Sequence, residues 1–205
     1  RGQRMFSEAQ IERLEHPQTT LAASVGLNFG YGLGIYQTQH QGHSLFVHGG
    51  DADGYLSHLA YSPKTGRGYF VVITAFNHQP LARLKEALND WIIAATPRPA
   101  KPASFAVREE LRRLYVGQYR SASQRFPGAR SGERLRVIER DGQLFTQIGD
   151  DSPRPLVAVS ERHFRRPWET TATAAFITLG DGGMALQGSM GNWQRTGPLE
   201  RPSAQ

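Results

Sequence analysis

The sequence predicts an α+β chain, in which antiparallel strands covered by a helix are followed by a small all-β antiparallel barrel. Two observations favour this: four extended segments precede one amphipathic helical stretch, and many short strand-like segments fill the remainder. A third is the stretch TPRPAKPAS at 96–104, whose three prolines stiffen the chain and prevent regular pairing. We therefore divide the chain into residues 1–95, a linker at 96–104 and residues 105–205.

The first part opens with a short helix. Ser7-Glu8-Ala9-Gln10 is a capping box, and the helix must end before Pro17. Strands are expected where aromatic and β-branched residues concentrate between Gly, Pro and polar stretches, at 31–38, 44–49, 55–61 and 69–76. A second helix is expected from Pro80 to Ala95, because proline is tolerated in a first turn and one face collects Leu81, Leu84, Leu88, Trp91 and Ile92.

The second part reads as all-β. A short amphipathic helix over 107–114 leads into strand-like residues 115–121. Asp141-Gly142 is a favoured two-residue hairpin turn between the segments 133–140 and 143–150. Further short segments follow at 155–160, 163–166, 173–179, 184–190 and 192–196, with a glycine-rich turn at 180–183. Strands this short and closely spaced are typical of a small antiparallel barrel.

Composition excludes several functions. The chain has no cysteine, so disulfides, Cys-ligated zinc and thiol nucleophiles are excluded, and no apolar run is long enough to span a membrane. The net charge of +6 lies beyond residue 96, because residues 1–96 carry seven basic and seven acidic side chains. The arginines are scattered and no nucleic-acid motif accompanies them, so we interpret them as solvated surface and expect no nucleic-acid partner. Steeply salt-dependent binding to nucleic acid would indicate the alternative.

The stretch SPKTG at 62–66 contains Lys-Thr-Gly, one of the three motifs of penicillin-recognising serine enzymes. Here it lies between two strong strand segments, with Pro63 before it and Gly66 and Gly68 around it. That composition predicts a hairpin turn. A catalytic lysine of this kind should instead project from a strand edge, so we interpret Lys64-Thr65-Gly66 as a chance match.

A better candidate is HGGDADGY at 48–55. The run YGLGIY, then FVHGGDADGYLSHLAYSP and GYFVVITAFNH, resembles the C-terminal part of serine β-lactamase-related hydrolases, a family that includes class C β-lactamases, penicillin-binding peptidases and esterases. Many members have His-x-Gly in place of Lys-Thr-Gly. The resemblance spans about residues 5–95 and implies the sheet and helix of a β-lactamase/transpeptidase-like fold. YVGQYR, DGQLF and the final Trp-x-Arg resemble, more weakly, the lipocalin-like barrel appended to many of these hydrolases.

The resemblance implies roles for four residues. His48 would face the leaving group or substrate carboxylate, and the backbone N–H of Asp51 would be one oxyanion-hole donor. Gly49 and Gly50 would bind substrate, since a residue without Cβ lets the backbone approach closely. The implied reaction is cleavage of an amide or ester through an acyl-serine, with no metal and no cofactor. The implied substrate is a small molecule or peptide, and the implied location is periplasmic or secreted.

The other two motifs of this family do not occur in the 205 residues. None of the three lysines has a serine three positions earlier, and none of the four asparagines has Tyr or Ser two positions earlier. We therefore expect the chain to be the C-terminal portion of a hydrolase whose Ser-x-x-Lys and Tyr-x-Asn lie upstream of Arg1, and to be inactive alone. A natural degenerate relative without the nucleophile, or a non-catalytic module whose barrel binds a peptide or lipid-like ligand, are the alternatives.

Three other constellations are weaker. His40, His43 and His48 cluster without a carboxylate between them, which argues against a metal site. The glycine-rich run at 30–34 is followed by no helix, so it does not offer a phosphate loop. Asp51 and Asp53 fit an acid/base pair, but aspartates in a glycine-rich loop more often form turns.

Overall fold

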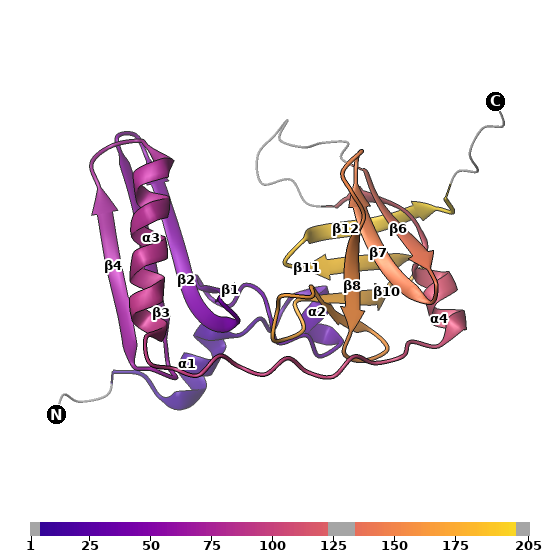
Figure 1. Cartoon of the computed structure of the whole chain (residues 1–205), viewed down its shortest axis with the longest axis horizontal. Helices are drawn as coiled ribbons and strands as arrows, with labels where there is room; N and C mark the ends of the chain where they lie inside the picture. The colour runs from indigo at the N-terminus through magenta and orange to yellow at the C-terminus, as the bar shows by residue number, and fades with distance from the viewer. Residues whose placement is uncertain (1–4, 123–133, 200–205) are drawn as a thin grey trace. The chain divides into compact units, whose positions relative to one another are not determined.

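The structure is a computed structural model that describes residues 5–122 and 134–199. It contains two compact units (Figure 1). Unit 1 comprises the chain up to Gln18 together with Phe29–Ala100, and unit 2 comprises Thr19–Asn28 together with the chain from Lys101 onward. The division at 95 and 105 stays a prediction, and the membership of Thr19–Asn28 in the second unit was not anticipated.

Unit 1 is an antiparallel sheet of order β1-β2-β3-β4, with helix α3 along one face (Figure 1). Its strands are β1 (Tyr36–His40), β2 (His43–Ala52), β3 (Tyr55–Ser62) and β4 (Arg67–Ile73), and α3 is His78–Ile93. Strand β1 begins five residues later than expected, because the preceding residues form a turn in which Gly32 N donates to Ile35 O at 2.7 Å. Helix α3 begins before Pro80, since the Asn77 side chain caps it by accepting from Gln79 N at 3.1 Å.

The core of unit 1 lies between the sheet and α3. It includes Leu45, Val47, Ala60, Ile92 and Ile93. Two residues that we expected on the buried face of the helix are half-exposed, Leu84 at 41% and Trp91 at 49%. The sheet covers only part of the helix circumference. The apolar face of α3 is therefore wider than the surface that β3 and β4 bury.

Helix α1 (Glu8–Glu15) belongs to the same unit, and its end contacts residues on the other sheet face. Its predicted capping box is confirmed: Gln10 N donates to Ser7 Oγ and Ser7 N donates to Gln10 Oε1. At its last residue, buried Glu15 accepts from Tyr61 Oη at 2.8 Å, and Tyr61 stacks on Phe46 with ring centroids 5.6 Å apart. Burial is the largest cause that raises the pKa of Tyr61, and the hydrogen bond to Glu15 raises it further.

A buried histidine beneath α3 makes the stability of unit 1 dependent on pH. His58 Nδ1 lies 3.0 Å from Tyr69 Oη, which donates to Asn89 Oδ1 at 3.1 Å. Burial lowers the pKa of His58 to about 4, and the charge on Lys85 acts in the same direction. The same burial raises the pKa of Tyr69 to about 12. His58 is therefore neutral in the folded protein at pH values where the unfolded chain already protonates it.

We expect the free energy of unfolding to fall as pH is lowered from about 6.5 toward about 4, by up to about 3 kcal/mol in total. The sign follows from the lowered folded-state pKa, because protons then bind the unfolded chain more strongly. Urea unfolding at about pH 7 and about pH 5 measures the difference. His58→Gln keeps a polar group beside Tyr69 but does not titrate, so its pH dependence should be shallower. Equal dependence in both proteins would show that His58 is not the source.

Unit 2 is a closed antiparallel barrel of eight strands, as expected from the short segments (Figure 1). Neighbours follow the order β10-β11-β12-β5-β6-β7-β8-β9, and the predicted Asp141-Gly142 turn has both residues at positive φ, 50° and 76°. The strands are β5 (Gly117–Ser121), β6 (Arg134–Arg140), β7 (Gln143–Ile148), β8 (Arg154–Ala158), β9 (His163–Arg165), β10 (Ala174–Thr178), β11 (Met184–Gly188) and β12 (Gly191–Gly197).

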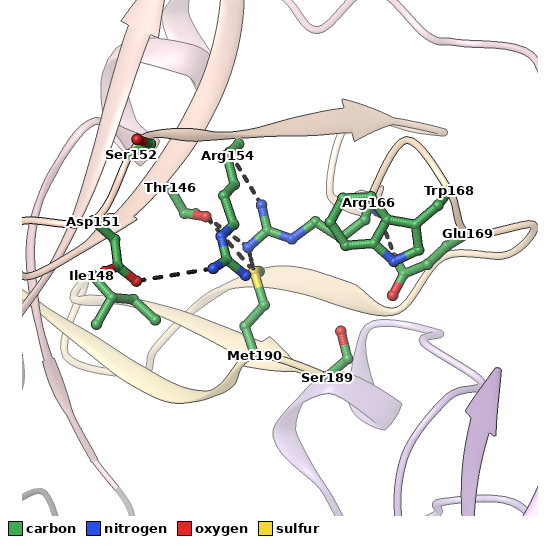
Figure 2. A pocket seen from close by; sticks show the side chains of 10 residues that line it. All are labelled: Thr146, Ile148, Asp151, Ser152, Arg154, Arg166, Trp168, Glu169, Ser189 and Met190. Atoms are coloured by element: carbon green, nitrogen blue, oxygen red, sulfur yellow. Dashed lines mark hydrogen bonds and ion pairs between the residues drawn. The ribbon is translucent and has the colours of Figure 1, made fainter. Parts of the chain in front are cut away.

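Side chains fill the barrel interior. Leu135, Val137, Phe164, Phe176 and Leu186 are among the buried residues of one continuous cluster. An eight-stranded barrel is just wide enough for such filling, so no channel runs along its axis. At one end, buried Arg166 hydrogen-bonds to residues of β7, β8 and the β11–β12 turn (Figure 2). Short helix α2 (Leu21–Ser24) belongs to this unit, since Ala22 N donates to Gln187 Oε1 of β11 at 2.6 Å.

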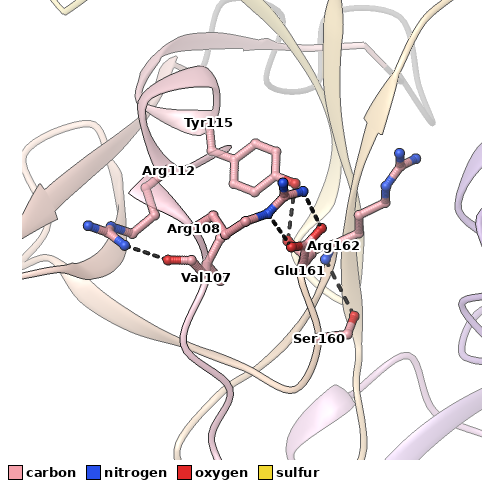
Figure 3. A network of polar contacts seen from close by, with 7 residues as sticks. All are labelled: Val107, Arg108, Arg112, Tyr115, Ser160, Glu161 and Arg162. Atoms are coloured by element: carbon pink, nitrogen blue, oxygen red, sulfur yellow. Dashed lines mark hydrogen bonds and ion pairs between the residues drawn. The ribbon is translucent and has the colours of Figure 1, made fainter. Parts of the chain in front are cut away.

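The other end of the barrel is closed by helix α4 (Glu109–Tyr115), which leads into β5. The Tyr115 ring stacks on Phe176 with centroids 4.0 Å apart, and Tyr115 Oη donates to Glu161 O at 3.1 Å. Arg108 adds two bonds to the Glu161 carboxylate from the start of the helix (Figure 3). None of the helices in the described part of the chain is long and apolar enough to cross a membrane.

Candidate functional site

The four predicted site residues lie in the second half of β2, next to the two-residue Asp53-Gly54 turn. His48 and Asp51 are exposed, and Gly49 and Gly50 are half-buried. His48 pairs with Leu59 of β3, and Gly50 pairs with Ser57. Because side chains alternate along a strand, the buried Val47 faces α3 and the His48 side chain points from the opposite face. The residues thus lie at a solvent-accessible strand end.

The imidazole of His48 contacts two tyrosine rings, those of Tyr31 and Tyr36. Its Nε2 lies 2.6 Å from Tyr31 Oη, and the His48 and Tyr31 rings meet edge-on with centroids 6.1 Å apart. Tyr31 in turn stacks on Tyr36 at 5.3 Å. A hydroxyl both donates and accepts, so Tyr31 can hold the histidine in one orientation whichever ring nitrogen carries the proton.

The turn that carries Tyr31 is fixed by close packing against α1. A Cβ placed on Gly32 would lie 2.1 Å from the carbonyl oxygen of Leu14. That same oxygen accepts from Leu33 N at 3.0 Å, and Gln37 N donates to Gly30 O at 3.0 Å. Only glycine fits at position 32, and its close approach fixes the turn that positions Tyr31 against His48. The glycine-rich run at 30–34 therefore has a structural role, since it holds this turn against α1.

Gly50 also stands where a side chain would be crowded. Ser57 Oγ donates to Gly50 O at 3.3 Å, and a Cβ on Gly50 would lie 2.6 Å from that hydroxyl oxygen. Gly49 differs, since its nearest non-neighbouring atom would be 3.8 Å away, an ordinary contact. A side chain at position 50 would therefore displace the Ser57 hydroxyl from Gly50 O, whereas one at position 49 would not.

The strand register defines the direction of the backbone amides. Ala52 and Tyr55 close a two-residue hairpin, so they form a hydrogen-bonded pair, and Asp51 with Leu56 forms the next, non-hydrogen-bonded pair. The same alternation directs the amide of Gly49 away from β3. On that side the neighbouring strand is β1, whose first residue, Tyr36, lies opposite Val47. Strand β1 therefore does not extend alongside Gly49 or Asp51. The N–H groups of Gly49 and Asp51 therefore point past the end of β1, where an anionic oxygen can accept from them.

Lys64-Thr65-Gly66 forms a turn between β3 and β4, as the sequence predicted. Thr65 N and Gly66 N both donate to Ser62 O, at 3.2 and 2.9 Å, and Gly66 has a φ of +64°. Lys64 is exposed at this turn. The turn is at the opposite end of β3 from the residues that pair with Gly50 and Asp51, so Lys64 is not part of the candidate site.

The three clustered histidines have separate environments. His40 Nε2 pairs with Asp90 Oδ1 at 2.6 Å, His43 is buried, and His48 contacts Tyr31. Burial lowers the pKa of His43. No group of three potential metal-binding side chains occurs among residues 5–122 and 134–199. Asp51 lies in the strand and Asp53 in the turn, so only Asp53 is a turn former.

Two residues of the site were not predicted, Tyr31 and Ser57. Tyr31 had been placed in a strand, and Ser57 had no distinguishing neighbour in the sequence. The one usable signal was register: with Asp53-Gly54 as a two-residue turn, Ser57 must lie opposite Gly50. No comparable rule connects Tyr31 to His48.

No protein-family model matches this chain, and no curated protein matches it. Two crystal structures of SurE, one with D-Leu, show similarity at TM-scores of 0.43 and 0.42, with 18% and 19% identity over 82% of this chain. The chain spans 40% and 38% of their lengths. An octameric penicillin-binding protein homologue from Pyrococcus abyssi is more distant, at a TM-score of 0.29 and 16% identity over 93% of this chain and 42% of that one.

Proposed function

We propose that unit 1 supplies one wall of the active site of a serine hydrolase of the β-lactamase/penicillin-binding type. The nucleophile would come from a Ser-x-x-Lys segment outside these 205 residues. The observation that carries the proposal is the end of β2, where the His48 imidazole, the crowded Gly50 and the outward amide of Asp51 occur within four consecutive residues.

This arrangement supports acyl transfer for two reasons. Backbone N–H groups fixed in a sheet and directed past its edge are suited to an oxyanion, because they need no reorganisation as charge develops. One such donor contributes roughly 3 kcal/mol to the stabilisation of the transition state. His48, which hydrogen-bonds to Tyr31, would donate to a leaving group or to a substrate carboxylate.

The substrate class is an amide or ester, because an oxyanion donor and a polar side chain serve both. The proposal also includes export of the protein to the periplasm or the medium. Within the 205 residues the chain has no nucleophile of this class, so on its own it should not turn over such substrates.

The coding sequence upstream of Arg1 tests this proposal. We expect it to encode Ser-x-x-Lys, then Tyr-x-Asn or Ser-x-Asn between that motif and Arg1, and an export signal at its start. Extending the gene sequence and reading the translated frame is sufficient. A stop codon immediately before Arg1, or a long upstream region without those motifs, would contradict the proposal.

A further inference from the structure

A cavity of about 310 Å³ lies at the end of the barrel opposite α4 (Figure 2). Its walls come from the end of β7, the start of β8, the loop after β9 and the β11–β12 turn, all within unit 2. The interior of the barrel is filled by side chains, so this cavity is confined to the mouth. Its volume is at the lower end of the range found for small-molecule sites.

One wall is a buried guanidinium. Arg166 Nη1 donates to the carbonyl oxygens of Arg154 and Pro155 at 3.1 and 3.2 Å, and Nη2 donates to Thr146 Oγ1 at 2.8 Å and to Met190 Sδ. None of these four acceptors carries a charge. These four bonds fix the guanidinium in place, but none of them brings a negative charge into contact with it.

The nearby Glu169 carboxylate is engaged by other groups. Its Oε2 accepts from the backbone N of Arg166 and from Thr173 Oγ1, both at 2.6 Å. Burial lowers the pKa of Arg166, the negative charge of Glu169 raises it, and the positive charge of Arg154 lowers it again. The second arginine thus adds repulsion at the same cavity.

Arg154 is the movable member of the pair. Its side chain is 63% exposed, and its only ion pair among the described residues is with Asp151, at 4.0 Å. A contact that long and that exposed contributes little, so the guanidinium can turn toward a ligand at small cost. At the rim, Trp168 is 55% exposed, and Met190 and Ile148 add apolar surface.

We propose that this cavity binds a small monocarboxylate with an apolar or aromatic body. The carboxylate would accept hydrogen bonds from the exposed Arg154 guanidinium, whose geometry matches a carboxylate, and its negative charge would offset the repulsion between Arg154 and the buried Arg166, whose four Nη hydrogens are already bonded. The body would pack against Trp168 and Met190. The chain beyond residue 96 carries the entire net charge of +6, which favours the approach of an anion. This site is independent of the function proposed for unit 1.

Calorimetric titration of the 205-residue chain with hexanoate tests the proposal. Hexanamide has the same body without the charge, and acetate has the charge without the body. We expect saturable one-to-one binding of hexanoate, and affinities at least about tenfold lower for hexanamide and acetate. Equal affinity for hexanoate and hexanamide, or no saturable binding of hexanoate up to about 10 mM, would overturn the proposal.

Variants locate the binding site. Arg154→Gln removes one charge from an exposed side chain, so the fold should persist while hexanoate affinity falls about tenfold or more. Arg113→Gln makes the same change on α4 at the closed end of the barrel, and should alter the affinity less than about twofold. Trp168→Ala should weaken hexanoate more than acetate. Equal losses in the Arg154 and Arg113 variants would mean that binding depends on net charge alone, which contradicts a site at the mouth.

Discussion

His48→Ala is expected to lower kcat/KM by roughly ten- to a thousandfold in the protein that carries this chain, equivalent to about 1.4–4 kcal/mol of transition-state stabilisation. The reason is that His48 is exposed, points from the solvent-accessible face of β2 and has Tyr31 as its side-chain hydrogen-bond partner. Its removal leaves the core between the sheet and α3 intact, so the thermal midpoint should move by only a few degrees. Hydrolysis of p-nitrophenyl esters, measured with the melting temperature, provides both quantities.

Two further variants make this result interpretable. Lys64→Ala, in the turn that carries the Lys-Thr-Gly match, should change the rate little and the stability by less than about 0.5 kcal/mol. Tyr31→Phe keeps the ring stacked on Tyr36 but removes the hydroxyl, so it should reduce the rate less than His48→Ala does. A hundredfold loss in the Lys64 variant would mean that the wrong motif was chosen. Unfolding of the His48 variant would mean that the histidine is structural.

Gly188→Ala is expected to destabilise the barrel by at least about 3 kcal/mol. Gly188 ends β11 with a φ of +154°, which side chains rarely adopt, and an added Cβ would lie 2.0 Å from Thr173 O and 2.6 Å from Ala174 Cα. Both atoms belong to backbone on the neighbouring chain segment, so neither can move without disturbing the pairing of β10 with β11. Urea unfolding of the variant should show a lower midpoint.

Gly180→Ala is the matched control for this substitution. Gly180 lies in the turn between β10 and β11, and an added Cβ would meet nothing within 4 Å. Its stability should stay within about 0.5 kcal/mol of the unaltered protein. If both variants unfold at the same urea concentration, the close backbone contact at Gly188 does not constrain the barrel.

Much of the secondary structure could be predicted because its determinants are local. Ser7 and Gln10 cap α1 through bonds that span three residues, and Asp141-Gly142 fixes a hairpin by its own backbone preferences. The strands of both units follow aromatic and β-branched segments closely. The start of β1 moved because of a contact distant in sequence, the packing of Gly32 against Leu14, which turns residues 31–35 out of the strand. The start of α3 moved because of a local contact, the cap by Asn77.

The parts that could not be predicted depend on long-range contacts. The bond between Tyr31 and His48 joins residues 17 apart, and the bond from Ala22 to Gln187 joins residues 165 apart. The scattered arginines of the second part are predicted to lie on the solvated surface, but Arg166 is buried. Its burial follows from the closure of the barrel around Thr146 and Met190, which no local pattern specifies.

Labelling with a fluorophosphonate, read by intact mass and peptide mapping, tests most directly whether this chain is one wall of an acyl-serine site. The 205-residue chain alone should acquire no adduct. The product of the complete gene should acquire one, on the serine of an upstream Ser-x-x-Lys, and His48→Ala should slow its formation. An adduct on a serine within the 205 residues, such as Ser57, or no adduct on the complete product, would contradict the account.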